Sequence, residues 1–254
     1  MLDAFTEAQL FAFLAVFTRF GAAMMFLPGF GETFVSTRAR LLLALAVSFV
    51  ATPVVAAGIP ALPADMGGLL VFLFAEVTVG AFIGLLARAL FSALVSAGTI
   101  IAFHAGLSSS MVFDPSSNQQ NPVSGAILSM TGMTMLFVLN LHHAFIVGLV
   151  DSYGLFPAGE VPMLGDVADT FARMVAKSFE LAMQIAAPFI LLNTALNMAV
   201  GLLARLMPQL QVFFLMLPLQ IGLSLIILAL AMSGAMLFFF ETFREQTAGL
   251  FLMP

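Results

Sequence analysis

Long apolar segments, separated by short clusters of proline, glycine and polar residues, make up almost the whole chain. Within them Leu, Phe, Ile, Val and Ala follow one another without the strict alternation of apolar and polar positions that is typical of half-buried strands. The clusters between them mark the places where helices should end. The pattern predicts helices at about 4–27, 37–57, 67–104, 123–150, 166–200 and 206–243.

These predicted helices fit a lipid bilayer. No Asp, Glu, Lys or Arg occurs in 41–64, 89–113, 115–150, 181–204 or 206–240, and a helix needs about 20 apolar residues to cross the hydrocarbon core. The segment 67–104 would be about 57 Å long as a straight helix, more than one crossing requires. Pro188, Pro208 and Pro218 should kink the last two segments. We therefore predict an all-α, polytopic membrane-type protein of long, kinked helices and helical hairpins.

Composition supports a membrane protein and excludes several other classes. Of the 254 residues 62% are hydrophobic and 8% are charged, whereas a soluble domain has about 25% charged residues. The net charge is −5 without a basic cluster, so we expect no nucleic-acid partner. Cysteine is absent, which removes disulfides, thiolate metal sites and cysteine nucleophiles. No basic residue precedes Arg19, so we expect the first apolar segment to be retained rather than cleaved as a signal peptide.

The charges inside the apolar segments need partners. Glu76 and Arg88 lie about 120° apart around one predicted helix, so each should pair with another helix or another chain. Asp169, Arg173, Lys177 and Glu180 recur at helical spacing and form one charged stripe. Such a stripe should face protein or water rather than lipid, and we favour a subunit interface over an ion pathway.

The sequence gives little support for a catalytic or metal-binding site. His142 and His143 are adjacent, so on a helix their rings should point in different directions and not share an ion. We interpret them as polar residues near a helix interface. Neither an HExxH motif nor a GxSxG elbow is present. We predict no enzyme and no cofactor.

The segment "GLLARLMPQLQVFFLMLPLQIG", 201–222, resembles the FliR family of flagellar export-gate proteins and their SctT-like injectisome counterparts. The matching residues are Arg205, Pro208, Gln209, Val212, Phe213 and Pro218. Gln211 departs from the pattern, because the family usually has Asn there.

Further segments carry the same resemblance in the same order along the chain. They contribute Pro28, Gly29, Arg38, Arg40 and Pro53, then Glu76, Gly80 and Gly84, and finally His142, Ser152, Tyr153 and Pro157. The glycines have a physical use, because small residues four positions apart let helix backbones approach closely.

The resemblance implies a structural subunit of the type III protein export gate in the bacterial inner membrane, at the flagellar basal body. Its partners would be FliP, FliQ and FlhB, with lipid around the assembly and unfolded flagellar proteins passing through it. The fold would be a FliP-like part at about 1–180 followed by a FliQ-like hairpin at about 181–254. Residues assigned to subunit assembly by this resemblance and by their chemistry are Glu76, Gly80, Gly84, Arg88, Arg205, Pro208, Gln209 and Phe213. Alternatives are an injectisome gate subunit, a small-molecule secondary transporter and, disfavoured by the missing motifs, an intramembrane hydrolase.

One polar stretch, "GLSSSMVFDPSSNQQNP" at 106–122, interrupts the apolar chain and carries a single charge, Asp114. In the FliR family the loop at this position helps to plug the closed channel. The resemblance therefore implies plug residues Ser108, Ser109, Ser110, Met111, Val112, Phe113, Asp114 and Pro115. The alternative is a solvated linker.

Overall fold

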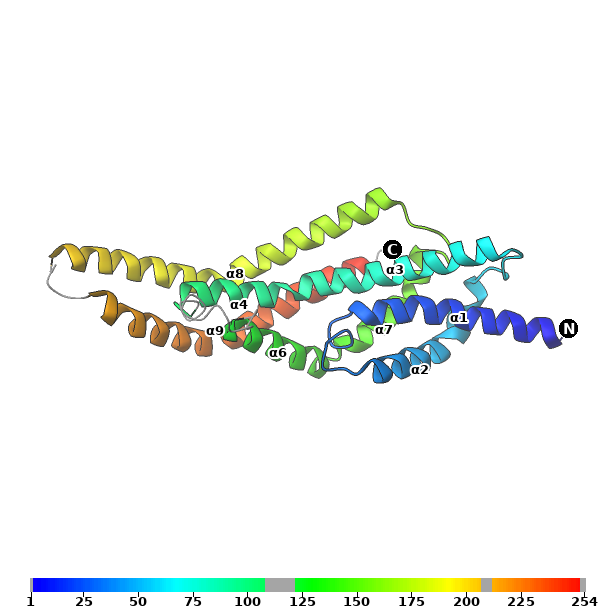
Figure 1. Cartoon of the computed structure of the whole chain (residues 1–254), viewed down its shortest axis with the longest axis horizontal. Helices are drawn as coiled ribbons and strands as arrows, with labels where there is room; N and C mark the ends of the chain where they lie inside the picture. Colours follow the sequence, from blue (N-terminus) through cyan, green and yellow to red (C-terminus); the bar gives the residue numbers. More distant parts are fainter. Residues whose placement is uncertain (1, 108–121, 207–211, 252–254) are drawn as a thin grey trace. The chain divides into compact units, whose positions relative to one another are not determined.

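All the regular secondary structure in the part of the chain that the structure describes is helical. The computed structural model describes residues 2–107, 122–206 and 212–251. Its elements are α1 (Leu2–Phe26), α2 (Thr37–Val55), the 3₁₀ helix η1 (Ala56–Gly58), α3 (Met66–Phe91), α4 (Ala93–His104), α6 (Val123–Val138), α7 (Leu141–Leu155), α8 (Leu164–Leu206) and α9 (Val212–Phe251) (Figure 1). The predicted all-α fold is confirmed.

The membrane prediction is also confirmed in length and composition. Among the described residues, five helical segments are long and apolar enough to cross a bilayer: Glu7–Phe26, Thr37–Gly58, Met66–His104, Leu164–Leu206 and Met216–Thr247. The bent pair α6 and α7 would raise the number to six. Pro53, Pro188 and Pro218 lie inside α2, α8 and α9.

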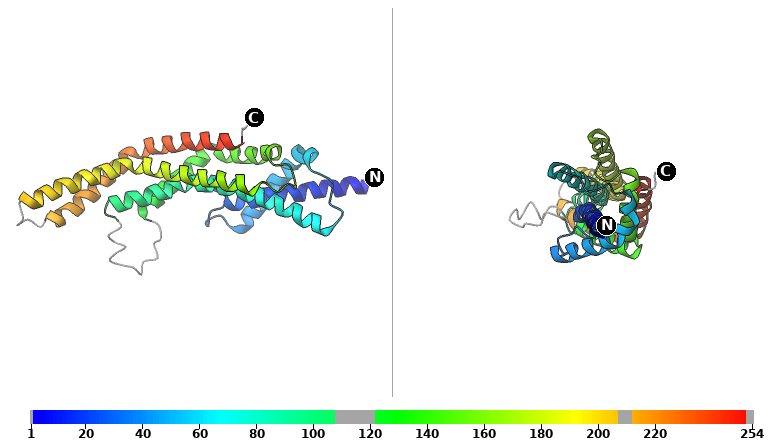
Figure 2. Two further views of the ribbon diagram at one scale, coloured as in Figure 1. Left: turned by 90° about the horizontal axis from the view of Figure 1, so that it is seen from above. Right: turned by 90° about the vertical axis from the view of Figure 1, so that its right-hand side faces the viewer.

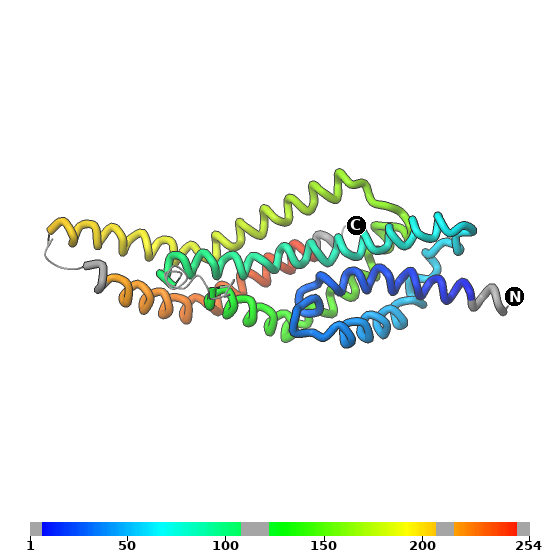
Figure 3. Tube along the Cα trace, in the orientation of Figure 1, coloured from blue at the N-terminus to red at the C-terminus, as the bar shows by residue number. Residues whose placement is uncertain are grey.

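The predicted uninterrupted helix at 123–150 is wrong. The axes of α6 and α7 differ by 70°, and the break falls at Asn140, whose φ is 57° (Figure 3). Asparagine tolerates this left-handed conformation better than most residues. The predicted segment 67–104 is likewise divided, because Ser92 separates α3 from α4. Neither break has a proline or glycine at the dividing residue, so no strong helix-breaking residue marks it in the sequence.

Contacts divide the chain into two compact units. The first comprises Met1–Leu90, Met133–Val175 and Glu245–Pro254. In it α1 packs against α2 and α3: the rings of Phe11 and Phe72 lie 5.0 Å apart, and those of Phe13 and Phe49 lie 6.4 Å apart. Apolar burial between these helices stabilises the unit.

The second unit comprises Phe91–Gly132 and Ala176–Arg244. In it most of α8 and α9 lie side by side as a hairpin (Figure 2). The rings of Phe91 and Phe239 lie 5.9 Å apart. α4 crosses α6 at Gly98 and Gly125, where a Cβ on Gly98 would overlap the backbone of Gly125. Both units combine distant parts of the sequence, and a division near residue 180 stays a prediction.

Candidate functional site

A buried ion pair lies at the centre of the first unit. The Nε of Arg19 in α1 donates to Oε2 of Glu76 in α3 at 2.8 Å, and Nη2 donates to Oε1 at 3.0 Å. Both side chains are 0% exposed. This two-point geometry is the strongest arrangement for a guanidinium and a carboxylate. Since a charge in an apolar surrounding is costly unless it is paired, each residue makes the other tolerable.

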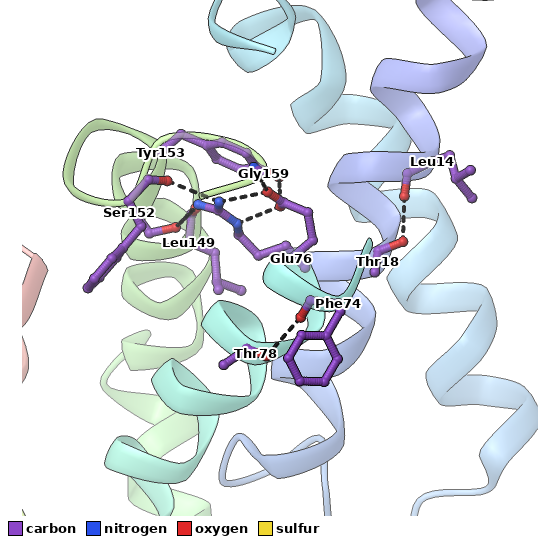
Figure 4. A network of polar contacts seen from close by, with 11 residues as sticks. Leu14, Thr18, Phe74, Glu76, Thr78, Leu149, Ser152, Tyr153 and Gly159 are labelled. Atoms are coloured by element: carbon purple, nitrogen blue, oxygen red, sulfur yellow. Dashed lines mark hydrogen bonds and ion pairs between the residues drawn. The ribbon is translucent and has the colours of Figure 1, made fainter. Parts of the chain in front are cut away.

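The end of α7 and the loop after it complete the network. Arg19 also donates to Oγ of Ser152 at 3.1 Å and to the carbonyl oxygen of Phe156 at 3.0 Å. The hydroxyl of Tyr153 donates to Glu76 at 3.2 Å, and the amide N–H of Gly159 donates to Glu76 at 2.9 Å. Figure 4 shows Tyr153 and Gly159 next to Glu76, with Ser152 on the same side as Tyr153 but farther from the carboxylate.

The phenol of Tyr153 makes two kinds of contact in this network. Besides its hydrogen bond to Glu76, its ring lies 3.7 Å, centroid to Cζ, from the guanidinium of Arg19. A cation over an aromatic face is stabilised by the ring electrons, and more so away from water. The network thus satisfies both charges and fastens α1, α3 and α7 together.

Two glycines bring α1 and α3 close enough for this pairing. A Cβ on Gly80 would overlap the carbonyl oxygen of Arg19, and a Cβ on Gly84 would lie 2.6 Å from the carbonyl oxygen of Ala23. The spacing of small residues noted in the sequence therefore acts inside the chain, at the contact between α1 and α3.

The residues predicted for subunit assembly fall into three groups. Glu76, Gly80 and Gly84 are buried within the chain, whereas Arg88 and Arg205 are exposed. No contact partner within the described residues is found for Arg88. Pro208 and Gln209 lie outside the described residues, and so does the side chain of Phe213 in α9. The predicted plug residues, 108–115, also lie outside them.

The expectation that Glu76 needs a partner from another helix or another chain is confirmed, and that partner is Arg19 of α1. Arg19 is the only charged residue within the apolar part of α1, and Glu76 is the only acidic residue of α3, whose other charge, Arg88, lies in the last turn. Two isolated opposite charges on separate apolar helices are a usable signal for a buried pair. That signal would have identified Arg19.

The predicted charged stripe on α8 exists as two separate pairs. Arg173 and Asp169 form one contact, at 2.5 Å, and Lys177 and Glu180 form another, at 3.0 Å. The side chains of the first pair are 74% and 63% exposed. Exposed pairs add little stability of their own.

The two adjacent histidines lie closer than their helical spacing predicts. The ring centroids of His142 and His143 are 4.1 Å apart, and that of Phe137 is 5.2 Å from His142. Among the described residues, no group of three or more His, Cys, Asp or Glu side chains is arranged to hold a metal ion. The interpretation of the pair as polar residues near a helix interface stays a prediction.

Comparison with known proteins agrees with the resemblance over nearly the full chain. The sequence pattern of bacterial export proteins, family 1, matches residues 10–246. The chain is 36% identical to the flagellar biosynthetic protein FliR of Caulobacter vibrioides over 245 residues, 96% of this chain and 98% of the relative. It is 32% identical to FliR of Bacillus subtilis over 227 residues, 87% of this chain and 86% of that relative.

A relative named as a translocation protein is more distant. The Yop proteins translocation protein T of Yersinia pestis is 25% identical over 173 residues, 67% of this chain and 66% of the relative. The two flagellar relatives above are more similar and match over more residues than this one. Membership of a family of export proteins argues against a secondary transporter and a hydrolase. The chain therefore belongs to the FliR family of bacterial export proteins, as a non-enzymatic inner-membrane component of the flagellar type III export apparatus.

Proposed function

We propose that the chain is a channel subunit that assembles with FliP and FliQ, next to FlhB, and helps to pass unfolded flagellar proteins across the inner membrane. The observation that carries the proposal is α8. This helix has 43 residues and would be about 64 Å long as a straight helix, about twice the thickness of the hydrocarbon core. Within this helix, only 17% of the 18-residue apolar window that qualifies it as a membrane span is buried inside the chain.

The exposed charged residues support the same proposal. Lipid offers no polar surroundings for the exposed Asp169–Arg173 pair of α8 and no counter-charge for the exposed Arg88 of α3. Charged groups at membrane depth face protein or water. Neighbouring subunits would supply both the missing polar partners and the missing apolar cover for such helices.

Assembly can be tested by co-production. We expect the chain to be degraded or aggregated when it is produced alone, and to purify in a fixed ratio with FliP- and FliQ-like proteins when all are produced together. The matched variant is Arg88→Leu, which should lower the yield of complex without removing any cross-helix contact described within the chain. A protease-resistant, monodisperse solitary chain would argue against a gate subunit.

The polar stretch at 106–122 is proposed to obstruct the closed channel. Its supports are its composition, with one charge among many Ser, Asn and Gln residues, and the way its flanks are held. Ser124 Oγ donates to the carbonyl oxygen of Gly98 at 2.7 Å, next to the contact between Gly98 and Gly125. The helices on either side of the stretch are therefore fixed to each other without it.

Deleting Ser108 to Asn118 is expected to leave the apparatus assembled but leaky, because no described helix contact is removed. Efflux of a small solute or ion should rise in cells that produce the assembled variant, while export is retained or only reduced. The control is a glycine–serine replacement of the same length, which keeps the chain length but removes Met111, Val112 and Phe113. If the deletion assembles, exports and leaks no more than the parent, the stretch is a linker.

A further inference from the structure

The C-terminus of α4 is capped by a specific hydrogen-bonding motif at Gly106. The N–H of Leu107 donates to the carbonyl oxygen of Ala102 at 3.0 Å, and the N–H of Gly106 donates to that of Phe103 at 3.3 Å. Gly106 has φ of 75°. These two bonds and the left-handed glycine form a Schellman motif. The carbonyl of His104, in the last turn, therefore needs a partner from outside the helix.

Residues from α8 and α9 supply that partner in the second unit. Gln220 Nε2 of α9 donates to the carbonyl oxygen of His104 at 2.5 Å and to Asn193 Oδ1 of α8 at 2.9 Å. Asn193 Nδ2 lies 3.0 Å from Nδ1 of the His104 ring. The three side chains are half-buried and link the last turn of α4 to both helices of the hairpin.

The hydrogen bonds fix which atoms are donors. A carbonyl oxygen can only accept, so the atom of Gln220 that faces His104 must be the amide nitrogen. That nitrogen then requires the oxygen of Asn193 on its other side, as does Nδ2 of Asn197 at 3.3 Å. The amide nitrogen of Asn193 is left to donate to His104. Nδ1 of His104 must therefore be an acceptor, and the ring proton must lie on Nε2.

No charged side chain competes for this cluster along the chain. α4 contains no Asp, Glu, Lys or Arg, and neither do 181–204 around Asn193 or 206–240 around Gln220. A proton on Nδ1 would bring two N–H groups together with no carboxylate in these segments to compensate.

We propose that His104, Asn193 and Gln220 form a polar clamp that positions the end of α4 on the α8–α9 hairpin, and that the clamp requires an acceptor at the Nδ1 position of residue 104. The clamp lies within one chain, so it does not depend on which subunits surround that chain. It places Ala105, Gly106 and Leu107, which directly follow α4, in a fixed position relative to the hairpin. The three residues are positioning residues for export.

Two substitutions at residue 104 separate the acceptor from the rest of the side chain. His104→Asn keeps an acceptor, because its Oδ1 can take the place of Nδ1, whereas His104→Leu fills similar space without one. We expect His104→Asn to secrete flagellar proteins at nearly the parent rate and His104→Leu to secrete about tenfold less, because Nδ2 of Asn193 is left without an acceptor and no longer holds the end of α4. Thr194→Val is the matched control, since Thr194 donates to Ile190 of its own helix at 2.8 Å.

The ring itself can be observed without any variant. The chain has three histidines, so nitrogen NMR of an apparatus in which this chain alone is histidine-labelled gives few signals. The signal that is missing in His104→Asn belongs to His104. The clamp predicts a proton on Nε2 and none on Nδ1. A proton on Nδ1 in the assembled parent would overturn the proposal. So would parent-like secretion by His104→Leu, or a loss in His104→Asn as large as that in His104→Leu.

Discussion

Replacing Arg19 with leucine is expected to cost the folded chain about 3–5 kcal/mol, because it leaves the carboxylate of Glu76 buried without its counter-charge. Glu76 would keep the hydroxyl of Tyr153 and the amide of Gly159, which do not neutralise it. A membrane domain with ordinary marginal stability would lose a large part of its stability. The amount of full-length, protease-resistant chain in membranes that contain the whole apparatus should fall sharply.

Three comparisons make this result specific. Thr18→Val changes the preceding residue, whose hydroxyl donates to Leu14 in the same helix at 2.8 Å, and should behave as the parent. Arg19→Lys keeps the charge but loses the two-point geometry, so it should be intermediate. The combined loss in Arg19→Leu with Glu76→Leu should be smaller than the sum of the single losses, because the two residues act as one unit. Additive losses would show that they do not interact.

Gly80→Ala is expected to have the second largest effect, about 1–3 kcal/mol, because the new methyl group would overlap the carbonyl oxygen of Arg19. The clash is with backbone, so it can be relieved only by moving α1 away from α3. That movement would also lengthen the contact between Arg19 and Glu76. The melting temperature of the purified apparatus measures the change.

Gly154→Ala provides the matched control for this substitution. Gly154 also lies in a helix of the first unit, α7, but a Cβ there would meet no atom within 4 Å. Alanine favours a helix over glycine, so this variant should be as stable as the parent or slightly more stable. Equal effects at Gly80 and Gly154 would mean that the close approach of α1 and α3 is not what the glycine provides.

The helices could be predicted from the sequence because their signals are local. Apolar runs, with proline and glycine between them, placed most helix boundaries within a few residues of those observed. The breaks at Ser92 and Asn140 could not be predicted, since neither residue is a strong helix breaker. The left-handed conformation of Asn140 depends on tertiary packing, which can override local preference.

The buried network shows a different limit. Sequence patterns indicate Glu76, Gly80, Ser152 and Tyr153 in two distant segments but not Arg19, which contacts Glu76, Ser152 and Tyr153. Their convergence depends on which helices lie next to each other, and single-sequence periodicity does not specify helix neighbours. For the same reason Glu76 and Gly80, expected at a subunit contact, are found holding α1 to α3.

Secretion of a flagellar protein into the medium tests the central claim most directly, that this chain is a structural component of the flagellar export apparatus whose fold depends on Arg19. Hook or filament protein would be measured in the medium of cells that lack the chain and carry the parent, Thr18→Val or Arg19→Leu. We expect no secretion without the chain, full secretion with the parent or Thr18→Val, and little with Arg19→Leu. Undiminished secretion by cells that lack the chain altogether would contradict the account.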